Sequence, residues 1–212
     1  LSAGVNFSKA YKVKLLGEGG QGRAELIQSR KTSKLFVVKH SKSRRHTMDH
    51  ERKMLEAVGS HDRLVRFHEL LNGSEFSDGK QRLMLDYYNG GDLSGFIDRH
   101  WDYNLPISEG MMWHVFSQLA EAVDYIHQRD VVHCDIKPEN VLLERDPSGW
   151  PRLKLSDFGL ADFALKAGRR KGYYGTAIWQ PNDEFRHTKE ADVYAIGAII
   201  HYMATFETPA TV

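Results

Sequence analysis

A glycine-rich run near the start of the chain restricts the possible folds more than any other feature. The run from Gly17 to Gly22 lies between two strand-like segments, Tyr11 to Leu15 and Ala24 to Ile27. The glycines of a dinucleotide-binding fold open a helix instead, so the strand context argues against that fold. Glycines in a hairpin let backbone amides approach phosphates, although ordinary turn chemistry also explains such runs.

A lysine and a glutamate follow at positions suited to the same task. Lys39 ends the apolar segment Leu35 to Val38, where a lone lysine would often be an edge charge. The helical pattern from Met48 to Val58, which Gly59 should terminate, carries Glu51. Because a carboxylate can hold a lysine against phosphate oxygens, the pair favours nucleotide binding more than either residue alone.

The remaining periodicity predicts an α+β chain with a small antiparallel-sheet lobe and a mainly helical second lobe. The turn-forming residues 89–91 place a hinge between lobes 1–88 and 89–212. Ser108 is a plausible N-cap of a long helix that buries Met112, Val115, Phe116, Leu119, Val123 and Ile126. Further elements are expected as strands at Leu64 to Leu70, Leu83 to Tyr87, Val131, Val141 to Leu143 and Leu153 to Leu155, and as a helix at Ala191 to Met203.

The densest chemical signal lies in the second lobe. The sequence His133-Cys134-Asp135-Ile136-Lys137-Pro138-Glu139-Asn140 is followed by Asp157-Phe158-Gly159, and chance is a poor explanation for both motifs in this order. With these motifs the chain resembles the eukaryotic protein kinase family, of the Ser/Thr type, from Tyr11 to about Pro209. The resemblance implies a bilobed protein-kinase-like fold whose second lobe is truncated at its C-terminal end.

The resemblance also implies a catalytic assignment. Asp135 corresponds to the catalytic aspartate that accepts the substrate hydroxyl proton, and Lys137 to the lysine that contacts the transferred phosphate in Ser/Thr kinases. Asn140 and Asp157 correspond to the Mg²⁺ ligands, and oxygen ligands suit this hard cation. Lys39 and Glu51 correspond to the ion pair of the family. The implied cofactors are ATP and Mg²⁺, and the implied substrate is a protein Ser or Thr hydroxyl.

The same resemblance implies the nucleotide-binding residues. Leu85 corresponds to the gatekeeper, and Asp86 to Tyr88 to the hinge that hydrogen-bonds adenine. Asp92 would meet the ribose or a basic residue of the substrate. The complete implied set is Gly17, Gly19, Gly22, Ala24, Val37, Lys39, Leu85, Asp86, Tyr88, Asp92 and Leu142, with Ala24, Val37 and Leu142 around the adenine ring.

Cys134 departs from the pattern of many family members, which carry an arginine before the catalytic aspartate. That arginine is neutralised by a phosphorylated residue of the activation loop. Between Leu160 and Thr176 this chain has no Ser or Thr, although Tyr173 and Tyr174 are present. We therefore predict that activity does not require phosphorylation of the loop, and that Cys134 is a small buried residue. The resemblance also implies structural roles for Thr176, near Asp135, and for Asp192, which anchors the catalytic loop.

Composition restricts the partners. The chain has 29 Lys and Arg against 28 Asp and Glu, so net charge gives no reason to expect nucleic acid or an anionic membrane. A single cysteine and the lack of a long apolar segment favour an intracellular protein, cytoplasmic or nuclear. Two alternatives stay open: a pseudokinase or scaffold that uses the fold only for binding, and a small-molecule kinase of kinase-like fold.

Overall fold

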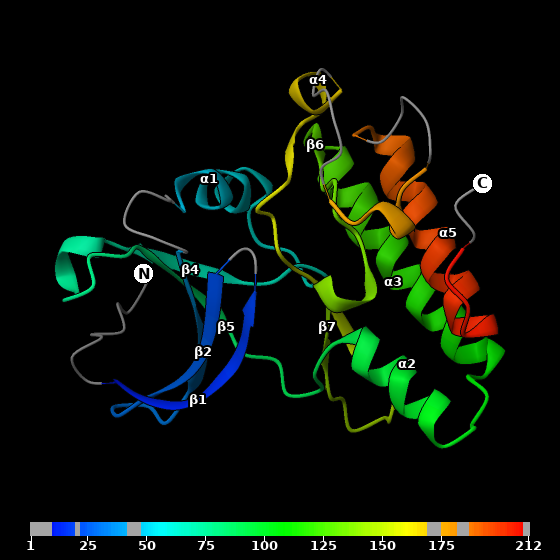
Figure 1. Ribbon diagram of the computed structural model, residues 1–212, viewed down its shortest axis with the longest axis horizontal. Coiled ribbons are helices and arrows are strands. Elements are labelled where there is room, and N and C mark those ends of the chain that lie inside the picture. The colour runs from blue at the N-terminus through cyan, green and yellow to red at the C-terminus, as the bar shows by residue number, and fades with distance from the viewer. Residues whose placement is uncertain (1–9, 20–21, 42–47, 169–174, 182–186, 210–212) are drawn as a thin grey trace. The chain divides into compact units, whose positions relative to one another are not determined.

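The computed structural model describes residues 10–19, 22–41, 48–168, 175–181 and 187–209 (Figure 1). The chain divides into two compact units. The first, which we call the sheet unit, contains Leu1–Glu56 and Arg66–Tyr87, and the second, the helical unit, contains Ala57–Val65 and Tyr88–Val212. Among the described residues, no helix is both long enough and apolar enough to cross a membrane.

The sheet unit is built on a five-stranded antiparallel sheet with strand order β1-β2-β3-β5-β4. A short 3-10 helix, Gly73–Glu75, lies between β4 and β5. Sequence-adjacent strands pair directly, except that β5 inserts between β3 and β4. The strands are β1 (Ala10–Gly19), β2 (Gly22–Ser29), β3 (Leu35–His40), β4 (Phe67–Leu71) and β5 (Arg82–Asp86).

Side chains alternate strictly along β3, and this alternation gives the sheet two different faces. Phe36 and Val38 are buried and pack with Ile27 and Met84 in one apolar cluster. Lys39, between Val38 and His40, points to the opposite face, where helix α1 (Asp49–Val58) supplies its partner. The sequence therefore sends its apolar residues to one core and its lysine to the other side.

Helix α1 ends as the sequence predicts. Gly59 follows its last residue with a φ of +70°, a left-handed conformation that is cheap for glycine and costly for other residues. Two acidic residues, Asp49 and Glu51, lie in its first turn, where the positive end of the helix dipole favours them. One of these, Glu51, is also the predicted partner of Lys39.

The helical unit contains α2 (Leu93–Asp102), α3 (Glu109–His127), the short α4 (Ala164–Ala167) and α5 (Lys189–Thr205). Helices α3 and α5 pack against each other and run side by side in Figure 1. The predicted N-cap of α3 is confirmed, because the Ser108 side chain accepts a hydrogen bond from the Met111 amide. Two small antiparallel pairs, β6 (Val131–Val132) with β9 (Asp162–Phe163) and β7 (Val141–Glu144) with β8 (Arg152–Leu155), carry the loops between the helices.

Three expectations about local structure were wrong. Helix α2 was not predicted, although Asp92 caps it by accepting a hydrogen bond from Gly95 N at 2.8 Å. The strand expected from Leu64 begins only at Phe67, and Leu64 instead forms an isolated parallel bridge with Leu155 of β8. Phe116 is 39% exposed, since the buried face of α3 lies along Val115, Leu119, Val123 and Ile126.

Candidate functional site

The predicted Lys39–Glu51 ion pair is formed. Lys39 Nζ lies 2.9 Å from both Oε1 and Oε2 of Glu51, and the two side chains are only 15% and 6% exposed. An ammonium ion donating to both oxygens of one buried carboxylate is held in a narrow range of positions. The lysine is thus presented as a fixed positive charge on one face of the sheet.

The glycine-rich run forms the end of the β1–β2 hairpin. Gly17 pairs in register with Ala24, and Gly19 with Gly22. Gly22 has a φ of +138°, a value that residues with a Cβ rarely adopt. Ala24 is the cross-strand neighbour of Lys39, and Val37 lies two residues before that lysine. The register therefore places the residues expected around adenine on the lysine face of the sheet.

Strand β5 carries the expected gatekeeper and the first hinge residue. Leu85 is buried and pairs in register with Val37. The Asp86 carboxylate lies 2.8 Å from both His68 Nε2 and Lys34 Nζ, and its backbone amide donates to Arg66 O. Burial raises the pKa of Asp86, but hydrogen bonds from His68 and Lys34 outweigh it and lower that pKa to about 2. The side chain of Asp86 is therefore an internal ion-pair partner of the sheet unit, a role that the sequence did not reveal.

In the helical unit, Asp135 lies at the centre of a dense polar network. Its side chain is almost fully buried, and Asn140 Nδ2 donates both to its backbone oxygen, at 2.7 Å, and to Oδ2, at 3.1 Å. Lys137 Nζ lies 3.2 Å from Oδ2. A buried carboxylate is costly unless it is paired in this way, so the network both permits and positions the charge.

Thr176 connects the two charged groups of this network. Its Oγ1 accepts a hydrogen bond from Lys137 Nζ at 2.8 Å and donates one to Asp135 Oδ1 at 3.1 Å. Gly175 has a φ of +85°, and a Cβ there would lie 2.6 Å from Cys134 O. Only glycine therefore fits the backbone that brings Thr176 to the aspartate.

Asp192 of α5 fixes the turn that precedes Asp135. It is 2% exposed, and its Oδ2 and Oδ1 accept hydrogen bonds from the amides of His133, at 2.8 Å, and Cys134, at 3.0 Å. His127 Nε2 lies 2.9 Å from the same Oδ2. Cys134 adopts a left-handed φ of +64°, a strained conformation that these bonds hold in place. The structural role expected for Asp192 is thus explained by its contacts.

Cys134 is buried, as predicted. It packs with Val132 and Ala167 in an apolar cluster that also touches Leu160 and Ala164. The space behind the turn is therefore apolar and contains no guanidinium that would need an anion. Tyr173 and Tyr174, the tyrosines of the loop, lie outside the described residues.

Asn140 and Asp157 belong to adjoining segments. Ser156, the residue before Asp157, donates to Asn140 O through both its amide and its hydroxyl, each at 2.9 Å. The following residue, Phe158, packs edge to face on the ring of His133, with ring centroids 4.8 Å apart. Asp157 itself has a left-handed φ of +65°. The backbone on both sides of Asp157 is therefore tied to the catalytic turn.

The chemistry of these two side chains fits a magnesium ion. Asn140 uses its amide nitrogen on Asp135, which leaves the amide oxygen as its donor for a hard cation. Within the described part of the chain, no cluster of three or more His, Cys, Asp or Glu could hold a metal alone. Mg²⁺ typically takes one or two carboxylates or amides and fills its shell with water and phosphate oxygens, so Asn140 and Asp157 suffice.

Three further residues expected at the nucleotide lie in the helical unit. Asp92 and Leu142 form an isolated antiparallel bridge, and the Asp92 Oδ1 atom is used to cap α2. The Tyr88 ring lies 5.4 Å from Lys154 Nζ. The structure thus brings Asp92 and Leu142 together, whereas the side-chain capping role of Asp92 was not predicted.

Comparison with known proteins agrees with this fold and these networks. Residues 11–211 match the family described as the protein kinase domain, and the chain belongs to that family.

Individual relatives are Ser/Thr kinases by name. The chain is 26% identical to the probable serine/threonine-protein kinase zyg-1 of Caenorhabditis briggsae, over 99% of its own length and 29% of that protein. It is 31% identical to CBL-interacting protein kinase 9 of Oryza sativa subsp. japonica, over 88% of its own length and 41% of the relative. The ovarian-specific serine/threonine-protein kinase Lok of Drosophila melanogaster is 29% identical, over 91% of this chain and 43% of its own. The chain thus spans less than half of the length of these relatives.

Proposed function

We propose that this chain is an active Ser/Thr protein kinase domain, which transfers the γ-phosphate of ATP to a Ser or Thr hydroxyl of a protein substrate. The observation that carries the proposal is the network of Asp135, Lys137, Asn140 and Thr176. A carboxylate that needs only to be buried could be paired by one cation. Here it is also oriented by an amide and a hydroxyl, as expected for a group that must meet a substrate at a defined angle.

Asp135 would orient the substrate hydroxyl and accept its proton as the phosphorus–oxygen bond forms. Lys137, held beside Asp135 by Thr176, would neutralise charge on the transferred phosphoryl group. Lys39, fixed by Glu51, would bind phosphate oxygens of ATP. These roles need positioning and charge rather than a covalent intermediate, and the rigid contacts of each group supply the positioning.

Asn140 and Asp157 would hold Mg²⁺, which supplies charge neutralisation of the nucleotide phosphates when it is bound. We assign nucleotide contacts to Gly17, Gly19, Gly22, Ala24, Val37, Leu85, Asp86, Tyr88, Asp92 and Leu142, and keep residues 88 and 89 as the proposed border of the lobes. Because the side chain of Asp86 is committed to His68 and Lys34, its part in adenine binding would be limited to its backbone.

The balanced charge of the chain supports a protein as substrate rather than nucleic acid or a membrane, and we propose a cytoplasmic or nuclear location. The pseudokinase alternative predicts nucleotide binding without transfer. The small-molecule kinase alternative predicts transfer to a metabolite rather than to a peptide.

The proposal is tested by phosphate transfer from ATP to a Ser/Thr peptide library. Asp135→Asn should bind ATP but lose at least ~10²-fold in turnover, since positioned proton transfer contributes about 10²–10⁴-fold. Asp102→Asn, a change of an exposed aspartate at the end of α2, is the matched control and should retain the wild-type rate. Equal rates for Asp135→Asn and wild type, or ATP binding without transfer by the wild type, would contradict the proposal.

A further inference from the structure

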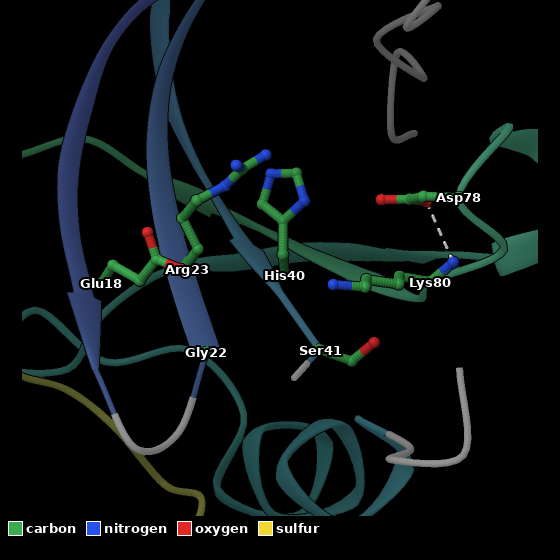
Figure 2. A pocket seen from close by; sticks show the side chains of 7 residues that line it. All are labelled: Glu18, Gly22, Arg23, His40, Ser41, Asp78 and Lys80. Carbon is green, nitrogen blue, oxygen red and sulfur yellow. Dashed lines mark hydrogen bonds between the residues drawn. The ribbon is translucent and has the colours of Figure 1, made fainter. Parts of the chain in front are cut away.

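A second polar site lies on the opposite face of the sheet unit from Lys39. A hollow of about 270 Å³ is lined by Glu18, Gly22, Arg23, His40, Ser41, Asp78 and Lys80 (Figure 2). His40 alternates with Lys39 along β3 and pairs in register with Arg23, so both side chains point away from the lysine face. The hollow is therefore separate from the residues that we assign to adenine and to the Lys39–Glu51 pair.

Figure 2 shows how the charged groups of the hollow converge. The side chains of Asp78 and Lys80, from the segment between β4 and β5, both point toward His40, and Arg23 lies on the other side of the His40 ring. His40 and Ser41 are buried at 6% and 1% exposure. The hollow thus has a buried polar floor and two long basic side chains at its sides.

The carboxylates of this region are already engaged. Glu25, beneath the hollow, lies within 3.0 Å of Lys12, Arg23 and His40. Asp78 pairs with Arg82 at 3.0 Å and accepts the Lys80 amide at 3.1 Å. Their negative charge is therefore largely balanced before any ligand arrives.

Positive charge, by contrast, is left over. Lys80 Nζ makes no ion pair with any residue that the structure describes, and Arg23 uses one nitrogen on Glu25 with 43% of its side chain still exposed. Arg82 stacks its guanidinium 3.6 Å from the centre of the Phe76 ring and adds a buried positive charge behind the wall. The field at His40 reflects this excess: burial lowers the pKa of His40, Arg82 and Arg23 lower it further, and Glu25 opposes them.

We propose that this hollow binds a phosphate monoester, with Lys80 and Arg23 as its ligands beside His40. The size agrees, because a hollow of about 270 Å³ is just below the usual range for drug-sized ligands and suits one phosphate group with a few attached atoms. Two basic side chains that reach the same point from different strands match the several oxygens of such a group. Glu18, which has no ion-pair partner in the described chain, is the one group that opposes the anion.

The test measures binding rather than kinase activity, so it is independent of the proposed function. Inorganic phosphate is titrated into ¹⁵N-labelled protein saturated with a non-hydrolysable ATP analogue and Mg²⁺, and the amide signals of Gly22 and Ser41 are followed. Lys80→Met should weaken binding at least ~10-fold, as expected for loss of a charge-assisted hydrogen bond. Glu18→Gln should tighten binding, because it removes a like charge from the site. The control Lys53→Met, at an exposed lysine of α1, should bind as the wild type does.

A second variant guards against misfolding, and a second probe identifies the source of the phosphate. Arg23→Gln should weaken binding in the same direction as Lys80→Met, with the thermal unfolding of each variant measured alongside. Tighter binding of a peptide with one phosphoserine than of inorganic phosphate, with no response to the unphosphorylated peptide, supports the site and identifies a phosphorylated side chain. Equal binding of the two supports the site for a free anion. Wild-type affinity in both Lys80→Met and Arg23→Gln, or loss of the signal shifts when the ATP analogue is present, would overturn the proposal.

Discussion

Replacing Asp192 with asparagine should destabilise the helical unit strongly, although the change removes only one charge. The buried carboxylate accepts the amides of His133 and Cys134 through its two oxygens, and His127 contacts one of them. Asparagine keeps one oxygen but places an NH₂ group against the second amide, so one charged hydrogen bond becomes a contact between two donors. An unsatisfied buried donor costs about 1–3 kcal/mol, and a bond to a charged group is worth about 1.5–3 kcal/mol. We therefore expect a loss of about 3 kcal/mol.

Urea denaturation followed by circular dichroism measures this loss directly. For a two-state transition the midpoint should fall while the slope stays constant. Asp130→Asn is the matched control, because Asp130 is an exposed partner of Lys189 with a φ of +55°, which asparagine tolerates well. The control should unfold close to the wild type. If Asp192→Asn did the same, the bonds from Asp192 would not be what holds the turn, and the reasoning would be refuted.

Three further predictions concern other contacts. Gly175→Ala should lower turnover strongly while ATP binding persists, because the new methyl group would meet Cys134 O and push Thr176 away from Asp135; unchanged peptide phosphorylation would contradict this. The Asp86 ion pairs should stabilise the sheet unit fully above about pH 4 and less as pH falls toward 2, because the folded-state pKa lies below the ordinary one; acid unfolding curves of wild type and Asp86→Asn should therefore converge near pH 2. Phosphatase treatment should leave peptide phosphorylation unchanged, since Cys134 packs in an apolar cluster; loss of most activity would show that a phosphorylated loop is required.

Local signals predicted much of the fold. The N-cap at Ser108 and the stop at Gly59 were predictable because a helix end is determined by a few neighbouring residues. Helix α2 was missed, since its capping signal directly follows the turn-forming residues 89–91, which dominated the pattern. The strand boundary at Leu64 was misjudged because its partner, Leu155, is distant in sequence and no local rule indicates it.

The candidate site shows the same division. The motif identified Asp135 and Asn140, and their contacts follow from a spacing of five residues. The commitment of Asp86 to His68 and Lys34 could not be predicted, because it depends on the register of three strands. Long-range side-chain partners are set by tertiary packing, which leaves only weak traces in a single sequence.

The dependence of the catalytic turn on Asp192 determines how far the chain can be shortened. His133 and Cys134 draw their hydrogen-bond acceptor from a helix that lies 59 and 58 residues further along the chain. A fragment that stopped before α5 would retain every residue of the His133–Asn140 motif, yet two amides of its strained turn would lose their acceptor. Engineers who seek a minimal version of this protein should therefore choose an end point after Thr205 rather than at the last recognisable motif.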